Sequence, residues 1–280
     1  MTDVGGTRSY YASFDRREWE RLETSQGRIE FELTTHFLAK TLPKSGRVLD
    51  IGGGPGRYSR WLDEMGYQAT LADLSPNLLD IARAEIGEKL IPEIVEADVR
   101  DLSRWPANTF DSTIALGPFY HLTSATDRRT ALEEIMRVTA PGGTIAIALM
   151  SKYALLRRTL AVRDERHRMA DTSFLEALLS RGTYENPIPG RFTVGYGVEP
   201  SKAAEAFEEA GLITVTVAST HGFATGLEEQ IESLRSEDPE AYASTLEVLK
   251  STASDPSLLG TAGHILYIGT NPARQGNQCR

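Results

Sequence analysis

The residues whose types and spacing most clearly indicate a ligand-binding site form a glycine-rich turn at residues 48–62, VLDIGGGPGRYSRWL. An acidic residue is followed there by alternating glycines, in the pattern Asp50-x-Gly52-x-Gly54-x-Gly56. Glycines let a backbone approach a ligand closely, and the first turn of a following helix offers free amide donors. The turn is therefore predicted to lie against a nucleotide-type ligand. The dinucleotide fingerprint G-x-G-x-x-G fits less well, because Arg57 occupies the position of its third glycine.

A second carboxylate, Asp73, ends the apolar run ATLAD. A carboxylate at the end of a second strand can accept hydrogen bonds from both hydroxyls of a ribose diol. The alternative is that Asp73 caps the helix expected from the text LSPNLLDIA. Only the first interpretation requires a ligand.

The elements that must position these residues are predicted by an alternation of short apolar runs and amphipathic stretches. The strand-like runs are RVLDIGG, QATLADLS, IPEIVEADV, FDSTIALG and TIAIALM. Amphipathic, helix-like segments separate them, which indicates a parallel sheet buried on both faces, in a doubly wound α/β fold. The spacing of apolar residues over residues 28–42 predicts a further helix over the first strand.

After residue 150 the alternation breaks. Residues 151–197 contain sequence typical of helices and the loop YENPIPGRFTVGYG, and we interpret this segment as a long insertion. A helix at SKAAEAFEEAGL, a strand at ITVTVAST, acidic helical text over residues 226–258 and a strand at GHILYIGTN follow. We therefore expect one domain over residues 1–280, with a helical cover (1–46), a core (47–150), a lid insertion (151–197), a C-terminal part of the sheet (198–271) and a polar tail (272–280).

Composition limits the class of partner. The formal net charge of -9 argues against long nucleic acid, which is held mainly by lysine and arginine. Cys279 is the single cysteine, so neither an internal disulfide nor a cysteine metal cluster is expected, and no metal site is predicted. The text shows no signal-peptide core and no membrane-spanning run, so we expect a cytoplasmic protein without a membrane partner.

Four segments taken together resemble the motifs of the class I S-adenosylmethionine (SAM) methyltransferases. They are the glycine turn after Asp50, the strand ending at Asp73, the segment EADVRDL and the segment FDSTIALGPFYHL. With RVTAPGGTIAIAL, the resemblance covers about residues 10–150. It implies a Rossmann-like, doubly wound, seven-stranded sheet, mostly parallel with an antiparallel last strand. The implied cofactor is S-adenosyl-L-methionine, with S-adenosyl-L-homocysteine (SAH) as its product.

The resemblance also assigns cofactor-binding residues. Asp98 would take the exocyclic adenine amine and the Val99 amide a ring nitrogen, while the loop after the fourth strand would border the methionine part and the reacting methyl group. The full implied set is Tyr11, Asp50, Gly52, Gly53, Gly54, Asp73, Leu74, Asp98, Val99, Leu116 and Gly117. Tyr11, with Tyr10 as the alternative, belongs to a segment resembling the start of a bacterial small-molecule branch, where a tyrosine covers the cofactor. These tyrosines could equally pack the segment against the core.

Tyr120 and His121 would stand beside the methyl group and are the candidate catalytic residues. A neutral histidine is a plausible base for a hydroxyl or ammonium acceptor. The alternative is that His121 caps the next helix or bonds a backbone group. The segment GPFY lacks two residues of the Asn/Asp-Pro-Pro-Tyr segment of relatives that methylate amide or adenine nitrogens, which makes such acceptors less favoured.

The insertion should cover the acceptor, because ligands in α/β folds bind beyond the carboxyl ends of the strands. Its candidate substrate-binding residues are Tyr153, Arg157, Phe192 and Tyr196. We therefore expect methyl transfer to an oxygen, nitrogen or carbon atom of an enclosed small molecule. A protein or tRNA methyltransferase and a non-catalytic SAM-binding subunit are the alternatives, and the oligomeric state is left open.

Overall fold

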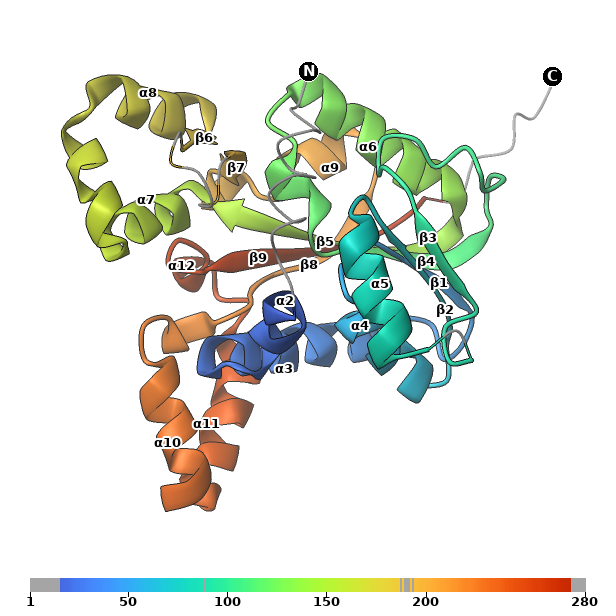
Figure 1. Cartoon of the computed structure of the whole chain (residues 1–280), viewed down its shortest axis with the longest axis horizontal. Coiled ribbons are helices and arrows are strands. Elements are labelled where there is room, and N and C mark those ends of the chain that lie inside the picture. Colours follow the sequence, from blue (N-terminus) through green and yellow to red (C-terminus); the bar gives the residue numbers. More distant parts are fainter. Residues whose placement is uncertain (1–15, 88, 187, 189–191, 193, 273–280) are drawn as a thin grey trace.

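The structure, a computed structural model, describes residues 16–272 apart from residues 88, 187, 189–191 and 193. A single sheet runs through it in the order β3-β2-β1-β4-β5, with β9 and then β8 beyond β5 (Figure 1). The strands of this row are β1 (Arg47–Ile51), β2 (Gln68–Asp73), β3 (Glu93–Glu96), β4 (Phe110–Ala115), β5 (Thr139–Ser151), β8 (Ile213–Ser219) and β9 (His264–Thr270).

The pairing confirms the expected fold. The strands β1 to β5 pair in parallel, whereas β9 is antiparallel to both β5 and β8. The last strand is thus the antiparallel one, as expected. The insertion adds two short strands to the predicted seven: β6 (Thr183–Glu185) and β7 (Val194–Val198) form a hairpin that extends the end of β5.

Helices cover both faces of the sheet because successive strand residues face opposite layers. In β5, Ile145 and Ile147 belong to one hydrophobic cluster and Ala146 to the other. The helices of the N-terminal half are α3 (Ser25–Thr41), α4 (Arg57–Glu64), α5 (Pro76–Glu85) and α6 (Ala125–Val138). Leu33 and Leu38 of α3 share a cluster with Val48 of β1, so the helix predicted over residues 28–42 forms, from residue 25 to residue 41, and packs with the first strand.

The insertion forms a separate lobe with its own small core. It contains α7 (Lys152–Ala161), the 3-10 helix η3 (Arg163–Ala170), α8 (Thr172–Arg181) and the β6–β7 hairpin. Leu155, Phe174, Leu178 and Tyr184 are buried together there, apart from the two clusters of the sheet. In Figure 1 this lobe stands away from the body, to which β5 and β7 join it.

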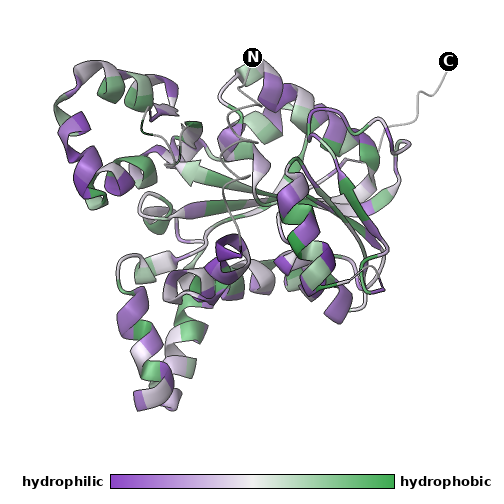
Figure 2. Ribbon diagram, in the orientation of Figure 1, coloured by the Kyte–Doolittle hydropathy of each residue, from purple (hydrophilic) through white to green (hydrophobic). Residues whose placement is uncertain are grey.

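The C-terminal part completes the sheet and adds a helical hairpin. Its helices are η4 (Pro200–Lys202), α9 (Glu205–Glu209), η5 (Gly222–Ala224), α10 (Glu228–Glu237), α11 (Pro239–Thr252) and α12 (Pro256–Leu259). Ile231 and Leu249 anchor the α10–α11 hairpin in the cluster that contains α3. Figure 2 shows hydrophilic residues along much of the outer surface of this hairpin. Over the described residues, no helix is long and apolar enough to cross a membrane.

Candidate cofactor cleft

A cleft opens where the parallel strands end, as expected for ligand sites in open α/β sheets. It holds about 1090 Å³ of empty space, its open mouth included. The structure brings most of the predicted cofactor and catalytic residues together in its wall: Asp50, Gly52, Gly53, Gly54, Asp73, Leu74, Asp98, Val99, Leu116, Gly117, Tyr120 and His121. Tyr10 and Tyr11 lie outside the described residues.

The glycine turn leaves open space on the ligand side. Gly52 has a φ of 70° and Gly54 a φ of 57°, in the left-handed region that favours glycine. A β-carbon on Gly52 would overlap the Pro118 ring, so close packing explains this glycine. A β-carbon on Gly54 would meet only Leu78 Cδ1, at 3.7 Å. Gly54 therefore borders empty cleft rather than protein.

Asp73 ties the glycine turn to the loop after β2. Its Oδ2 accepts a hydrogen bond from the Gly54 amide at 2.8 Å, and its Oδ1 accepts one from the Ser75 amide at 2.8 Å. Ser75, rather than Asp73, is the N-cap position of α5. Burial raises the pKa of Asp73 to about 6, against the opposing backbone hydrogen bonds. Each carboxylate oxygen retains a further lone pair with which to accept a ligand hydroxyl.

Asp50 is a buried carboxylate with an unsatisfied oxygen. Its Oδ2 accepts a hydrogen bond from the Ser59 hydroxyl at 2.7 Å, whereas its Oδ1 is buried with no hydrogen-bond partner. Burial, with a smaller contribution from nearby Asp73, raises the pKa of Asp50 to about 7. Because buried polar atoms are normally paired, the free oxygen fits a donor supplied by a ligand. An ammonium group, such as that of a SAM methionyl part, matches this requirement.

At the predicted adenine end, Asp98 already has a cationic partner. Arg100 Nε lies 3.0 Å from Asp98 Oδ1, and Arg100 Nη2 lies 2.6 Å from Asp98 Oδ2. Arg100 Nη1 also donates to Asp127 Oδ2 at 3.2 Å. Sequence reasoning did not single out Arg100, although it stands two residues after Asp98. Its guanidinium orients the carboxylate and itself lines the cleft.

Tyr120 and His121 lie on η2 (Pro118–His121), directly after β4. His121 is buried, and this burial lowers its pKa to about 4 although a hydrogen bond to the Val194 backbone opposes the shift. Burial likewise raises the pKa of Tyr120. At neutral pH both side chains are uncharged, and His121 is a weak proton acceptor. Its bond to Val194 corresponds to the backbone-bonding alternative for His121.

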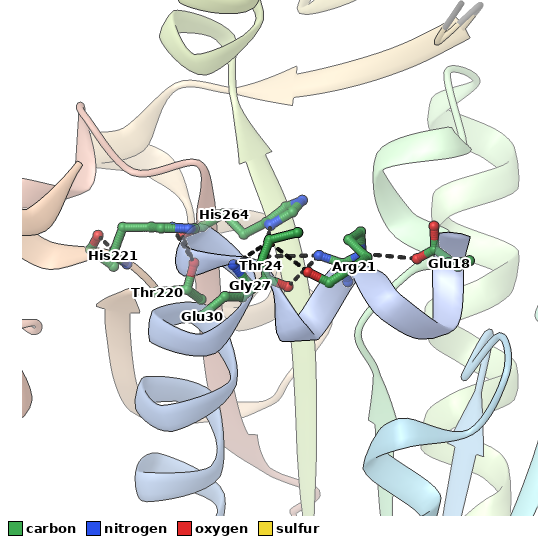
Figure 3. Close-up of polar contacts among 9 residues, drawn as sticks. Glu18, Arg21, Thr24, Gly27, Glu30, Thr220, His221 and His264 are labelled. Atoms are coloured by element: carbon green, nitrogen blue, oxygen red, sulfur yellow. Dashed lines mark hydrogen bonds and ion pairs between the residues drawn. The ribbon is translucent and has the colours of Figure 1, made fainter. Parts of the chain in front are cut away.

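A polar network that sequence reasoning missed borders the cleft on its N-terminal side (Figure 3). It begins in α2 (Arg17–Glu20) and η1 (Arg21–Glu23), where Arg21 Nε donates to Glu18 Oε1 at 2.8 Å. Arg21 Nη1 donates to both carboxylate oxygens of Glu30 at 3.1 Å. Burial alone would raise the pKa of Glu30, but Arg21 and then His264 hold it well below its usual range. Glu18 and Arg21 line the cleft.

The four predicted substrate residues are spread over the insertion. The Phe192 ring lies 5.2 Å from the His121 ring, measured between centroids, so it reaches the wall of the cleft. The Tyr196 ring packs under the Arg128 guanidinium at 3.5 Å. Tyr153 is 39% exposed, and Arg157 Nη1 donates to the Thr261 carbonyl oxygen at 2.8 Å. None of the four is among the residues that line the cleft in this structure.

Among the described residues, no group of three or more histidine, cysteine, aspartate or glutamate side chains is arranged to hold a metal ion. The acidic and cationic side chains of the cleft instead suit an organic ligand with hydroxyl, amine and ammonium groups.

Comparisons with known proteins agree with this geometry. Residues 49–147 match the model of a methyltransferase domain family. A glycine/sarcosine N-methyltransferase from Parasynechococcus marenigrum is 35% identical over 161 residues, which cover 55% of each chain. A ubiquinone/menaquinone biosynthesis C-methyltransferase, UbiE, from Neisseria meningitidis is 36% identical over 124 residues, or 42% of this chain and 49% of that protein. The chain thus spans about half the length of these curated relatives.

Solved structures share the fold. A SAM-dependent methyltransferase from Methanosarcina mazei aligns with a TM-score of 0.56 and 13% identity, covering 84% of this chain and 97% of that chain. A 1,6-didemethyltoxoflavin-N1-methyltransferase from Burkholderia thailandensis, solved with bound 1,6-didemethyltoxoflavin and S-adenosylhomocysteine, aligns with a TM-score of 0.53 and 16% identity, covering 96% of this chain and 87% of that chain. With the sheet order and the glycine turn, these findings show the fold of SAM-dependent methyltransferases, and within it residues 49–147 match the methyltransferase domain family.

Proposed function

We propose that this protein binds SAM in the cleft and transfers its methyl group to a small molecule held beneath the insertion lobe. The observation that carries the proposal is the pair of buried carboxylates Asp50 and Asp73 on either side of a glycine turn that leaves open space at Gly54. Asp50 Oδ1 lacks a hydrogen-bond partner and the oxygens of Asp73 keep free lone pairs, so both carboxylates can accept hydrogen bonds from a ligand.

Each end of the cleft would then bind a different part of SAM. The free Oδ1 of Asp50 would accept a hydrogen bond from the methionyl ammonium, and Asp73 would accept from the ribose hydroxyls. Asp98, fixed by Arg100, would accept from the adenine amine, and the buried Val99 would supply its amide. Leu116 and Gly117 would border the reacting end. Bound SAM supplies a sulfonium-activated methyl group, so the protein mainly aligns the acceptor and excludes water.

The insertion lobe is the proposed acceptor cover. Phe192 packs beside His121, and the Val194 backbone bonds the same imidazole, so the lobe and the cleft wall are in direct contact. A cover of this kind favours a small, enclosed acceptor. Several relatives also have names that specify small molecules, among them the glycine/sarcosine and the ubiquinone/menaquinone methyltransferases.

The test is to incubate the purified protein with methyl-labelled SAM and separate small-molecule, protein and RNA fractions of a cell extract. Label in the small-molecule fraction supports the proposal. Label in protein or RNA would replace the acceptor class with a macromolecule. Binding of SAH by calorimetry without transfer to any fraction would favour a non-catalytic SAM-binding subunit, and absence of SAH binding would contradict the cofactor assignment.

A further inference from the structure

A carboxylate and an imidazole that the proposed cofactor site does not use lie behind the wall of the cleft. His264 is the first residue of β9 and pairs with Met150 near the end of β5. Because β9 is antiparallel, its first residue reaches the edge at which the parallel strands end. The Nδ1 atom of His264 lies 3.3 Å from Oε2 of Glu30 (Figure 3). The His264 ring stacks on Tyr120, which lines the cleft, with centroids 5.3 Å apart.

The charged and titratable groups around His264 come from four elements. They are Glu30 from α3, Arg21 from η1, Tyr120 and His121 from η2, and His221 just after β8. Of the described carboxylates, Glu30 is the one within hydrogen-bonding distance of the His264 ring. Arg21 fixes Glu30 from the other side, which leaves the carboxylate little freedom to turn away.

We propose that His264, oriented by Glu30, takes up the proton that the acceptor releases during methyl transfer. This inference rests on the proposed function. When the proton of the neutral ring is on Nδ1 and is donated to Glu30, the lone pair on Nε2 is free to act as a base. The side chain of His264 is 20% exposed, so water can reach it, and its ring stacks on Tyr120 in the cleft wall. Glu30 acts through His264 and is a positioning residue.

Proton and electrons are both conserved in this step. The acceptor oxygen or nitrogen loses its proton to Nε2 of His264, and its lone pair forms the new bond to the methyl carbon. The electron pair of the broken carbon–sulfur bond remains on sulfur, which changes from a sulfonium to a thioether. The imidazolium is held by the Glu30 carboxylate and then releases its proton to water. The pair therefore selects acceptors whose nucleophilic atom carries a removable proton, namely hydroxyl or ammonium groups.

The first test needs no acceptor. Diethyl pyrocarbonate acylates free imidazole nitrogens, and peptide mass spectrometry can follow each of the five histidines separately. Glu30→Gln should slow acylation of His264 by ~5-fold or more, because a carboxylate partner fixes the tautomer that leaves the lone pair of Nε2 free. Acylation of His167, exposed on η3, should not change. Equal rates at His264 in both proteins, or no reaction of His264 in the wild type, would overturn the pairing.

Because Glu30 also pairs with Arg21, folding of each variant is checked by circular dichroism. If Glu30→Gln does not fold, Glu30→Asp takes its place. It retains the charge with a shorter reach, and should give a smaller reduction in the His264 rate. An unchanged rate in that variant would also contradict the proposal.

The second test measures transfer of labelled methyl from SAM to the small-molecule fraction. His264→Gln should lower the rate by ~100-fold or more, as expected for loss of a general base, while SAH affinity by calorimetry stays within about twofold. Glu30→Gln should lower the rate as well, since the imidazole loses the carboxylate that orients it. Glu30→Asp should restore part of the rate, and His167→Gln is the matched control.

The two proposals fail in different ways. A wild-type protein that binds no SAH, or transfers no label to small molecules, contradicts the proposed function. A wild-type protein that transfers label at the same rate as His264→Gln contradicts only the role of His264.

Discussion

Asp73 and Gly54 are joined by a hydrogen bond of 2.8 Å from the Gly54 amide to Asp73 Oδ2, which connects the turn after β1 to the end of β2. The two residues are 19 positions apart in the sequence, yet together they form one corner of the cleft. This contact makes the shape of the glycine turn depend on the same carboxylate that would bind the ribose.

Replacement of this carboxylate should weaken cofactor binding. Asp73→Ala is expected to weaken SAH binding by ~2 kcal/mol or more, because two charge-assisted hydrogen bonds are lost. Isothermal calorimetry measures the change. Asp80→Ala, on the exposed side of α5, is the control and should bind SAH like the wild type. Unchanged affinity in a folded Asp73→Ala protein would remove Asp73 from the site.

The two glycines with positive φ should respond differently to a β-carbon. Each alanine substitution carries ~1–2 kcal/mol of backbone strain, but Gly52→Ala also overlaps the Pro118 ring. Gly52→Ala should therefore lose more stability in urea unfolding. Gly54→Ala has room for its methyl, which would occupy cleft space and weaken SAH binding. Equal unfolding midpoints for the two variants would contradict this distinction.

In the protein without ligand, the contribution of Asp50 and Asp73 to stability should fall as the pH rises. Asp50 has a folded pKa of about 7 and Asp73 of about 6, both raised by burial, whereas unfolded carboxyls titrate near 4. Between these values the two carboxyls bind more protons in the folded protein than in the unfolded chain, so their contribution to the free energy of unfolding decreases with pH. The decrease for Asp50 alone is about 4 kcal/mol at most, from the size of its pKa shift.

Urea unfolding at pH 5 and pH 8 measures this dependence. Asp50→Asn keeps the shape of the side chain but cannot ionise, so the fall in stability should be smaller in this variant. If the wild type and Asp50→Asn lost the same stability over this range, burial of an ionised Asp50 would not be the cause.

His121 should be dispensable as a base. Its pKa of about 4 leaves it neutral and weakly basic near pH 7, and its ring already bonds the Val194 backbone. His121→Asn should lower turnover by less than ~10-fold, below the usual contribution of a general base. Initial rates of label transfer to the small-molecule fraction provide the measurement. A loss of 100-fold or more with intact SAH affinity would return the role of base to His121.

The insertion lobe should open when the cleft is empty. Arg163 and Arg166 are exposed trypsin sites on η3, within a lobe whose core is separate from that of the sheet. Because locally opening segments are cut first, cleavage within residues 151–197 should be fast without ligand. SAH together with the small-molecule extract should slow it. Equal cutting under both conditions would identify the lobe as fixed structure and reopen the case for a larger acceptor.

The sequence alone was sufficient for the sheet and for the grouping of most residues that line the candidate cofactor cleft. Strands buried on both faces appear as short apolar runs, and the glycine turn and strand-terminal carboxylates mark the points at which those strands end. For this reason the local pattern predicts Asp50, Gly52, Gly54 and Asp73 at one edge of the sheet, and in the folded chain they line one cleft.

Only the tertiary structure decided which of these groups are already paired. Arg100 engages Asp98, Ser59 satisfies one oxygen of Asp50, and the other oxygen stays free. Burial likewise sets the low pKa of His121, which its sequence position beside the expected methyl group could not reveal. Solvation and pairing depend on neighbours from distant segments, and the local pattern does not record those neighbours.

The same reason explains the missed Glu30–His264 pair. These residues lie 234 positions apart, on a helix that precedes the sheet and on its last strand. Neither has a local motif, and the two are brought together because β9 runs antiparallel and α3 packs over the sheet. The chain's periodicity thus determined the fold and the edge at which the candidate cofactor cleft lies, whereas the packing of its two ends decided which side chains meet behind the cleft wall.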